Sequence, residues 1–187
     1  MRYTVRLAQR AEVMQLPKIE LAAAEQYQPY LDALELTPDL LTDIAPVSFM
    51  LRAQRDHRLW VAEVPSEDVK APPLSQPFTP AIVGFVLTRA LTDSFFIVEI
   101  DVLPAYGRCG IGTALMQAAC EAGTAKGFNT ITLTTFRRVP WTIPFYRRLG
   151  FNILPPEAWN DELLAITEHE ERYGFKREHR VVMQRRL

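Results

Sequence analysis

Short runs of β-branched and aromatic residues, separated by turn residues, recur along the chain and predict the strands of a sheet. Residues 82–91 and 95–103 are the clearest pair, because both are rich in Val, Ile, Phe and Thr and the polar residues 92–94 lie between them. This arrangement predicts a β-hairpin. Further strands are expected at 3–7, 59–64, 130–136, 151–154 and 179–184.

Apolar residues at helical spacing fill much of the sequence between these strands. Residues 113–126 end at Gly127, which is a typical helix stop. Residues 11–27 show the same spacing, although Pro17 must kink or divide that helix. Shorter helices are expected at 47–57, 141–149 and 159–173. Together these elements predict a mixed α/β fold with antiparallel hairpins before one central helix.

The length and composition fit one domain, spanning residues 1–187. Of the 187 residues, 48% are apolar and 23% are charged, which is normal for a globular protein with a substantial core. The segment 65–80 contains five prolines and is typical of a loop or flap. A domain linker is not expected there, because neither side is complete as a domain.

Charge and cysteine content exclude several classes of protein. The formal net charge of −1 gives no basis for a broad surface that binds nucleic acid or membrane, so we expect neither partner. Two cysteines are too few for a disulfide scaffold and fit a reduced compartment. The first residues lack the apolar core of a signal peptide, and no uninterrupted apolar run could span a bilayer. We therefore expect a cytoplasmic protein.

A glycine-rich turn at 106–113, Tyr-Gly-Arg-Cys-Gly-Ile-Gly-Thr, is the most informative segment of the chain. It follows the predicted strand 95–103 and opens the central helix. Glycines let the backbone approach a ligand closely, and the first unpaired N–H groups of a helix point at an anion. The turn therefore predicts a phosphate cradle, with amides from Cys109 to Thr113 and a charged contact from Arg108. Taken alone, it could equally be a tight turn that binds nothing.

A second motif, Pro144-Phe145-Tyr146-Arg147-Arg148-Leu149-Gly150-Phe151, follows the predicted strand 130–136. The order of Val102-Leu103-Pro104, the glycine-rich turn and this second motif resembles the GNAT superfamily of N-acetyltransferases. The resemblance covers roughly residues 82–154. It implies the acyl-coenzyme A N-acyltransferase fold, in which helices flank a central mixed, mostly antiparallel sheet.

The resemblance also implies the substrates and the residues that bind them. Acetyl-coenzyme A is the expected co-substrate, the acceptor is a primary amine on a small molecule or a peptide, and no metal is required. In the family, the strand corresponding to 95–103 is bulged and splays from the next strand, so that an amide near Val102 or Leu103 stabilises the oxyanion. Family members often form dimers, which makes a homodimer one expected assembly. The expected cofactor-binding residues are Ile100, Val102, Arg108, Cys109, Gly110, Ile111, Gly112 and Thr113.

Tyr146 is the first candidate for a catalytic side chain. The family has a Tyr at this position as the general acid that protonates the departing thiolate of coenzyme A. A phenol with a pKa of about 10 keeps its proton at neutral pH and can donate it to sulfur. Without the rest of the motif, a core aromatic between Phe145 and Phe151 would be the better interpretation.

The attacking amine must lose a proton, because an alkylamine with a pKa of about 10.4 is almost fully protonated at pH 7. Strand alternation predicts Glu99 and Asp101 on one face of 95–103, and Val98, Ile100 and Val102 on the other, unless a bulge breaks the parity. Glu99 is the favoured general base, acting directly or through water, and related enzymes often carry an acidic residue on this strand. A solvated polar face, or a salt bridge with a neighbouring Arg, is an equally good interpretation for Glu99 and a better one for Asp101.

Two positions depart from the family pattern. Gly107 stands where the family has Arg or Gln, and Thr142 stands where one subgroup has Asn after Trp. These departures favour, as an alternative, a non-catalytic sensor that binds acyl-coenzyme A. A dinucleotide-binding fold is disfavoured, because Leu115 stands at the place of the third glycine and no first βαβ unit precedes the turn.

The remaining regions carry few motifs. The histidines His57, His169 and His179 are scattered without metal-ligand spacing, so no metal site is expected. The acceptor pocket would be formed by the N-terminal helices, the segment 65–80 and the C-terminal segment.

Overall fold

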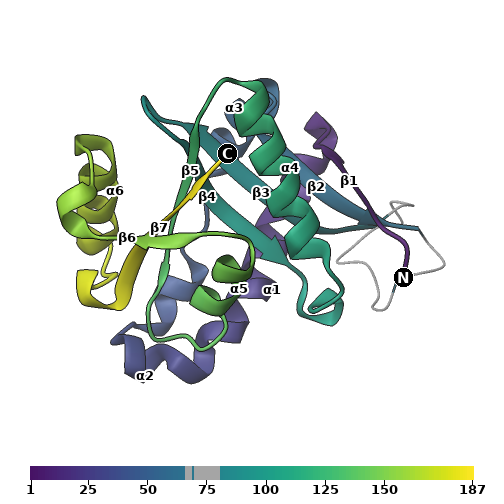
Figure 1. Ribbon diagram of the computed structural model, residues 1–187. Coiled ribbons are helices and arrows are strands. Elements are labelled where there is room, and N and C mark those ends of the chain that lie inside the picture. The colour runs from purple at the N-terminus through teal and green to yellow at the C-terminus, as the bar shows by residue number, and fades with distance from the viewer. Residues whose placement is uncertain (66–68, 70–80) are drawn as a thin grey trace.

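The computed structural model describes residues 1–65, 69 and 81–187. The loop predicted at 65–80 therefore lies almost wholly outside the described residues. The described chain forms a seven-stranded sheet in the order β1-β2-β3-β4-β5-β7-β6, in which only the pair β4–β5 is parallel. This confirms the predicted mixed, mostly antiparallel sheet (Figure 1). The strands are β1 (Thr4–Leu7), β2 (Leu59–Val64), β3 (Ala81–Ala90), β4 (Phe95–Val102), β5 (Thr130–Phe136), β6 (Asn152–Leu154) and β7 (Arg180–Arg186).

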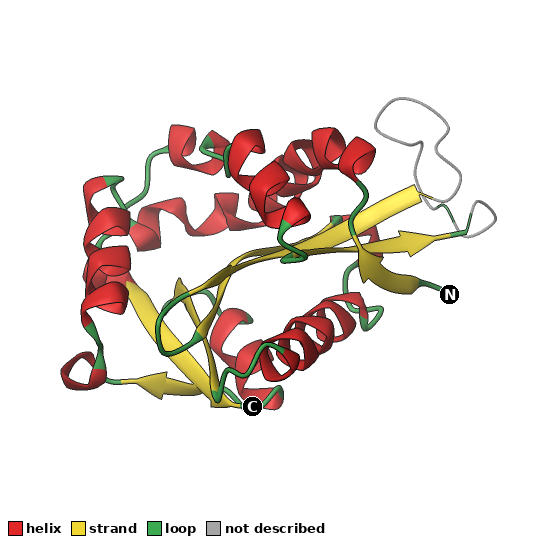
Figure 2. Ribbon diagram, turned by 90° about the horizontal axis from the view of Figure 1, so that it is seen from above, coloured by secondary structure: helices red, strands yellow, loops and turns green. Residues whose placement is uncertain are grey.

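Helices cover both faces of the sheet (Figure 2). On one face, Leu115 and Ala119 of α4 (Ile111–Ala125) are buried in a cluster with Phe95 of β4. On the other face, Leu16 of α1 (Leu16–Ala24) and Met50 of α3 (Val47–Arg55) belong to a second cluster with β3. The other helices are α2 (Leu31–Leu34), α5 (Thr142–Arg148) and α6 (Asp161–Arg172), and short 3-10 turns precede or link them.

The predicted helix at 11–27 is divided in the structure, as Pro17 required. A 3-10 turn (Arg10–Gln15) leads into α1, and a second 3-10 turn (Glu25–Tyr30) follows it. Pro17 lies in the first turn of α1, where its missing N–H leaves no hydrogen bond unmade. The proline therefore begins a helix rather than kinking one.

β4 carries a bulge and separates from β5, and these two features create the site. β4 and β5 pair only from Phe95 opposite Ile131 to Ile97 opposite Leu133 (Figure 1). The register between β3 and β4 shifts from Leu87–Glu99 to Thr88–Ile97, which leaves Val98 as the extra residue. Beyond this bulge β4 stays paired with β3 but diverges from β5.

The bulge also decides which side chains share a face. Val98 packs with the clusters on the α1 and α6 sides, whereas Ile100 and Val102 pack with the α4 cluster. Val98 therefore does not share a face with Ile100 and Val102, because the bulge breaks the alternation, which is the exception allowed for in the sequence prediction.

Gly84 of β3 lies opposite Val102 and allows β3 and β4 to approach closely behind the site. A Cβ atom at this position would lie 2.7 Å from the Asp101 carbonyl oxygen and 3.1 Å from Cγ2 of Val102. Gly84→Ala is therefore expected to lower the free energy of unfolding by about 1–3 kcal/mol, measured by urea denaturation. In the control Gly112→Ala, the added Cβ meets its nearest atom at 3.4 Å, an ordinary contact. Equal stability of the two variants would contradict the proposed crowding.

Candidate active site

The opening between β4 and β5 contains two adjoining cavities. The first, which we call the elbow cavity, has a volume of about 790 Å3 and is lined by the glycine-rich turn, the end of β4 and α5. The second, the acidic cavity, has a volume of about 430 Å3 and is lined by residues of α1, β4, β5, α6 and β7. Four residues line both cavities: Tyr27, Ile100, Asp101 and Tyr146.

The elbow cavity ends at the first turn of α4. Gly110 is the N-cap residue, with φ of 86°, a left-handed conformation that glycine adopts without strain. The first backbone bond of the helix runs from the Ala114 N–H to the Gly110 carbonyl, at 3.0 Å. The amides of 111–113 therefore have no acceptor within the helix and lie at its electropositive end.

Most residues predicted to bind the cofactor line the elbow cavity. These are Ile100, Val102, Arg108, Gly110, Gly112 and Thr113. Cys109 and Ile111 are not among the lining residues. The Ile111 side chain is 1% exposed and packs in the core, because it lies on the inner face of α4. Only backbone groups of Ile111 could therefore reach a ligand in the cavity.

The backbone N–H groups of β4 point alternately toward β3 and toward the opening. The Leu103 N–H donates to the Val83 carbonyl at 2.8 Å, so Leu103 cannot be the oxyanion donor considered from the sequence. Because antiparallel pairs alternate in their bonding, the amides of Ile100 and Val102 point away from β3. The Ile100 N–H lies 3.3 Å from Oε1 of Glu99. Val102 is the better available donor on this strand.

Tyr146 is held at the junction of the two cavities by α5. Thr142 is buried at the start of this helix and its hydroxyl contacts the carbonyls of Phe136 and Val139, at 2.7 and 3.0 Å. These bonds tie α5 to the end of β5, which gives Thr142 a structural role. The Tyr146 ring packs against the rings of Phe145 and Phe151. Burial, with additional repulsion from nearby acidic groups, raises the pKa of Tyr146 and keeps its hydroxyl protonated.

Three of the carboxyl groups that line the acidic cavity have raised pKa values: Glu20 from α1, and Glu99 and Asp101 from β4. Burial is the largest cause of the raised pKa of each. It raises the pKa of Glu20 to about 8, with repulsion from Glu99 adding to it. Repulsion from Glu99 and Glu20 raises the pKa of Asp101 further. Carboxyl groups that keep a proton to higher pH are suited to accept one from an amine near neutrality.

A buried ion pair lies across the acidic cavity from these groups. The Arg180 guanidinium donates to both carboxylate oxygens of Glu170, at 2.8 and 3.0 Å, and to the Thr134 hydroxyl at 2.9 Å. Its carbon lies 4.6 Å from the Phe136 ring centroid and 5.4 Å from that of Phe175. This cation is fixed by its partners and compensates Glu170.

Sequence reasoning missed Glu20, Tyr27, Glu170 and Arg180. Glu20 did carry a signal, because it follows Leu16 by four residues on the buried face of the predicted helix. A carboxylate on an apolar face requires an explanation. Arg180 and Glu170 meet only through the packing of α6 and β7, for which the sequence pattern gives no distance.

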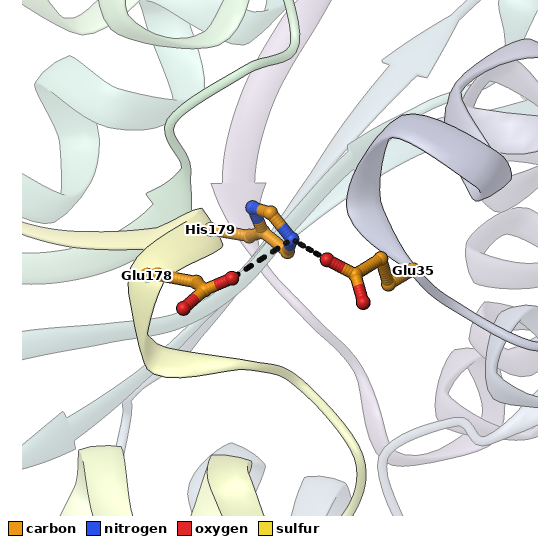
Figure 3. A group of neighbouring side chains, drawn as sticks. All are labelled: Glu35, Glu178 and His179. Atoms are coloured by element: carbon orange, nitrogen blue, oxygen red, sulfur yellow. Dashed lines mark hydrogen bonds and ion pairs between the residues drawn. The ribbon is translucent and has the colours of Figure 1, made fainter.

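A further group of possible metal ligands lies outside both cavities (Figure 3). Ligand atoms of Glu35, Glu178 and His179 lie within 4.8 Å of one another. The His179 Nε2 atom is 3.2 Å from Oε1 of Glu35, whose other oxygen accepts from the Lys176 ammonium. Because Lys176 already supplies a cation here, we interpret the group as a tie between the end of α2 and the start of β7.

Comparisons with known proteins agree with this geometry. A family model described as the acetyltransferase (GNAT) family matches residues 23–151, more than half of the sequence. The chain therefore belongs to the GNAT family of acetyltransferases, and the predicted type of enzyme is confirmed. No helix in the described part of the chain is long and apolar enough to cross a membrane.

Solved structures share the fold at low sequence identity. PaiA N-acetyltransferase from Thermoplasma acidophilum, in complex with coenzyme A, matches with a TM-score of 0.66 and 12% identity over the whole of both chains. Ard1 from Thermoplasma volcanium matches with a TM-score of 0.64 and 17% identity, covering 100% of this chain and 99% of its own. For the ribosomal-protein-S18-alanine N-acetyltransferase from Escherichia coli, the TM-score is 0.60 and the identity 15%, with 99% and 94% covered.

Proposed function

We propose that the protein transfers the acetyl group of acetyl-coenzyme A directly to a primary amine, with the cofactor in the elbow cavity and the acceptor in the acidic cavity. The observation that carries this proposal is that the same residues line both cavities. Tyr146 and Asp101 border both cavities, one of which ends in helix-start amides and the other in carboxylates. A proton donor and a proton acceptor therefore lie where a thioester and an amine would meet.

The elbow cavity fits coenzyme A by its donors. The amides of 111–113 and the left-handed Gly110 form a cradle for the pyrophosphate, and Arg108 lines the same cavity. A side chain of Arg or Gln at Gly107 is not needed for these backbone contacts. The PaiA structure, which contains coenzyme A, supports this assignment through its shared fold.

The chain's own groups then divide the chemistry between them. The Val102 amide stabilises the negative charge that develops on the acetyl oxygen. A carbon–nitrogen bond forms at the acetyl carbon and the carbon–sulfur bond breaks. Tyr146 donates its proton to the departing thiolate. Of the two protons that the ammonium loses, one passes through the carboxylates to solvent and the other restores the Tyr146 hydroxyl.

Purified protein mixed with acetyl-coenzyme A and a panel of amines tests the proposal through release of free thiol. Turnover of any amine above the rate of spontaneous hydrolysis supports it. Calorimetric titration with coenzyme A runs in parallel. Tight binding without turnover of any amine would instead favour a sensor of acyl-coenzyme A.

The general base is expected to come from Glu99 and Asp101. Asp101 lines both cavities and Glu99 only the acidic one, so Asp101→Asn is expected to have the larger effect. At neutral pH, kcat/KM should fall by about 10–100-fold. Wild-type activity should rise with pH as Asp101, whose pKa is raised by burial, becomes ionised.

The same variant has a distinctive pH profile. The loss of kcat/KM in Asp101→Asn, relative to the wild type, should become smaller toward about pH 10, because the amine there loses its proton without a base. Glu99→Gln serves as the comparison, and kcat/KM of all three proteins is measured from pH 6 to about pH 10. A deficit that stays constant across this range would indicate a positional role for Asp101 rather than proton transfer.

A further inference from the structure

The acidic cavity is lined by five residues with carboxyl groups and by two basic residues, Arg180 and His169. One guanidinium, that of Arg180, lines it, and it is paired with both oxygens of Glu170. Four further acidic residues line the cavity without such a partner among the described residues: Glu20, Asp43, Glu99 and Asp101. A cavity of this kind attracts cations and repels ligands that carry a carboxylate.

Glu20 and Asp101 each have a buried carboxyl oxygen without a hydrogen-bond partner among the described residues, and of the two only Glu20 lies outside the elbow cavity. The Glu20 side chain is 7% exposed. Oε1 accepts the Ala45 N–H at 2.9 Å, which fixes the direction of the carboxyl group. Oε2 is buried and has no hydrogen-bond partner among the described residues. A buried carboxyl oxygen without a partner is costly, and a ligand ammonium group that donates to it would relieve that cost.

The position of Glu20 separates it from the reacting centre. Asp101 and Tyr146 line both cavities, whereas Glu20 lines only the acidic one. The reacting nitrogen must be neutral when it attacks, and it becomes an uncharged amide in the product. The reacting nitrogen therefore cannot serve as a positive partner for Glu20 throughout the reaction. A cation beside Glu20 would therefore belong to a second nitrogen of the same acceptor.

We propose that the acceptor is a small diamine or polyamine, and that Glu20 binds its second, non-reacting ammonium group. This inference rests on the proposed function, since it names the acceptor for the same site. The size of the cavity, about 430 Å3, suits a small ligand. The second ammonium group keeps its protons and its charge throughout the transfer. The product therefore still binds Glu20 through this group.

Three amines with the same reacting end test the inference. The compounds are 1,5-diaminopentane, hexylamine and 6-aminohexanoate, which carry a positive, a neutral and a negative group at the far end of the same chain. Each is assayed for thiol release with acetyl-coenzyme A. The wild type should prefer the diamine over hexylamine by at least about 10-fold in kcat/KM, with 6-aminohexanoate the poorest acceptor. Linear diamines of other lengths and spermidine extend the series.

Glu20→Gln is the informative variant, and Glu25→Gln is its matched control. Glu25 is exposed, belongs to the next helical turn and lines neither cavity. Glu20→Gln should lose about 10–100-fold in kcat/KM for the diamine and little for hexylamine. Glu25→Gln should behave as the wild type with all three amines. Thermal shift provides a second measurement: the diamine alone should raise the Tm of the wild type and not that of Glu20→Gln.

The outcomes separate this inference from the proposed function. Acetylation of hexylamine as fast as the diamine, or an unchanged ratio in Glu20→Gln, would overturn the second-ammonium site and leave the transferase intact. A short peptide acetylated better than every diamine would also overturn it. No acetylation of any amine, while the diamine still raises the Tm through Glu20, would overturn the transferase and retain the cation site.

Discussion

Replacing Tyr146 with phenylalanine is expected to lower kcat by about 100-fold while the KM for acetyl-coenzyme A stays within about two-fold. The substitution removes only the hydroxyl, and the ring contacts with Phe145 and Phe151 remain. Without a proton donor the thiolate must leave unprotonated, which raises the barrier of the breakdown step. Steady-state kinetics with saturating amine measures the effect. Tyr30→Phe is the matched control, because Tyr30 packs on Trp141 and lines neither cavity.

Tyr27 is the competing donor, since it also lines both cavities. Burial raises its pKa as well, so its hydroxyl is also protonated at neutral pH. Its ring packs on Phe136 and Trp141, on the acceptor side of the opening. We expect Tyr27→Phe to alter the KM for the amine more than kcat. A large loss of kcat in Tyr27→Phe, with Tyr146→Phe unaffected, would transfer the role of the acid to Tyr27.

The sequence predicted the central part of the fold because its signals are local. The hairpin of β3 and β4 and the helix α4 are each specified by a run of suitable residues and a turn between them. The insertion of β7 between β5 and β6 has no such signal, because it joins strands distant along the chain. The bulge at Val98 has no local signal either, since no residue type requires a bulge, and it was expected only through the family resemblance.

The candidate site also has one part that could be predicted from the sequence and one part that could not. The elbow cavity is formed by contiguous motifs, so most of its residues could be named from the sequence, including Gly110, Gly112 and Tyr146. The acidic cavity is assembled from α1, α6 and β7 on either side of β4. Glu20 and Arg180 are 160 positions apart by their numbers and meet there only through tertiary packing. Glu20, which we propose binds the acceptor, is therefore a residue that sequence motifs could not identify.

Replacing Arg180 with methionine is expected to give the largest loss of stability, about 3–5 kcal/mol in the free energy of unfolding. The side chains of Arg180 and Glu170 are 15% and 18% exposed, so removal of the guanidinium leaves a carboxylate in a cavity that already contains four other carboxyl groups. Each kcal/mol corresponds to about 2–4 °C in Tm for a protein of this size. Calorimetry and urea denaturation measure the change. Arg177→Met is the control, because Arg177 and Glu171 form an exposed pair at 3.6 Å, expected to contribute less than about 1 kcal/mol.

The double variant Arg180→Met/Glu170→Met determines whether the loss arises from a stranded charge. If it does, removing Glu170 as well should restore a large part of the stability, because no uncompensated carboxylate remains. Strict additivity of the two single changes would contradict this explanation and point instead to lost packing between Phe136 and Phe175.

Arg180→Met should also move the alkaline rise of activity to higher pH. The guanidinium lowers the pKa of Glu99, so without it the carboxyl groups of the cavity hold their protons more strongly.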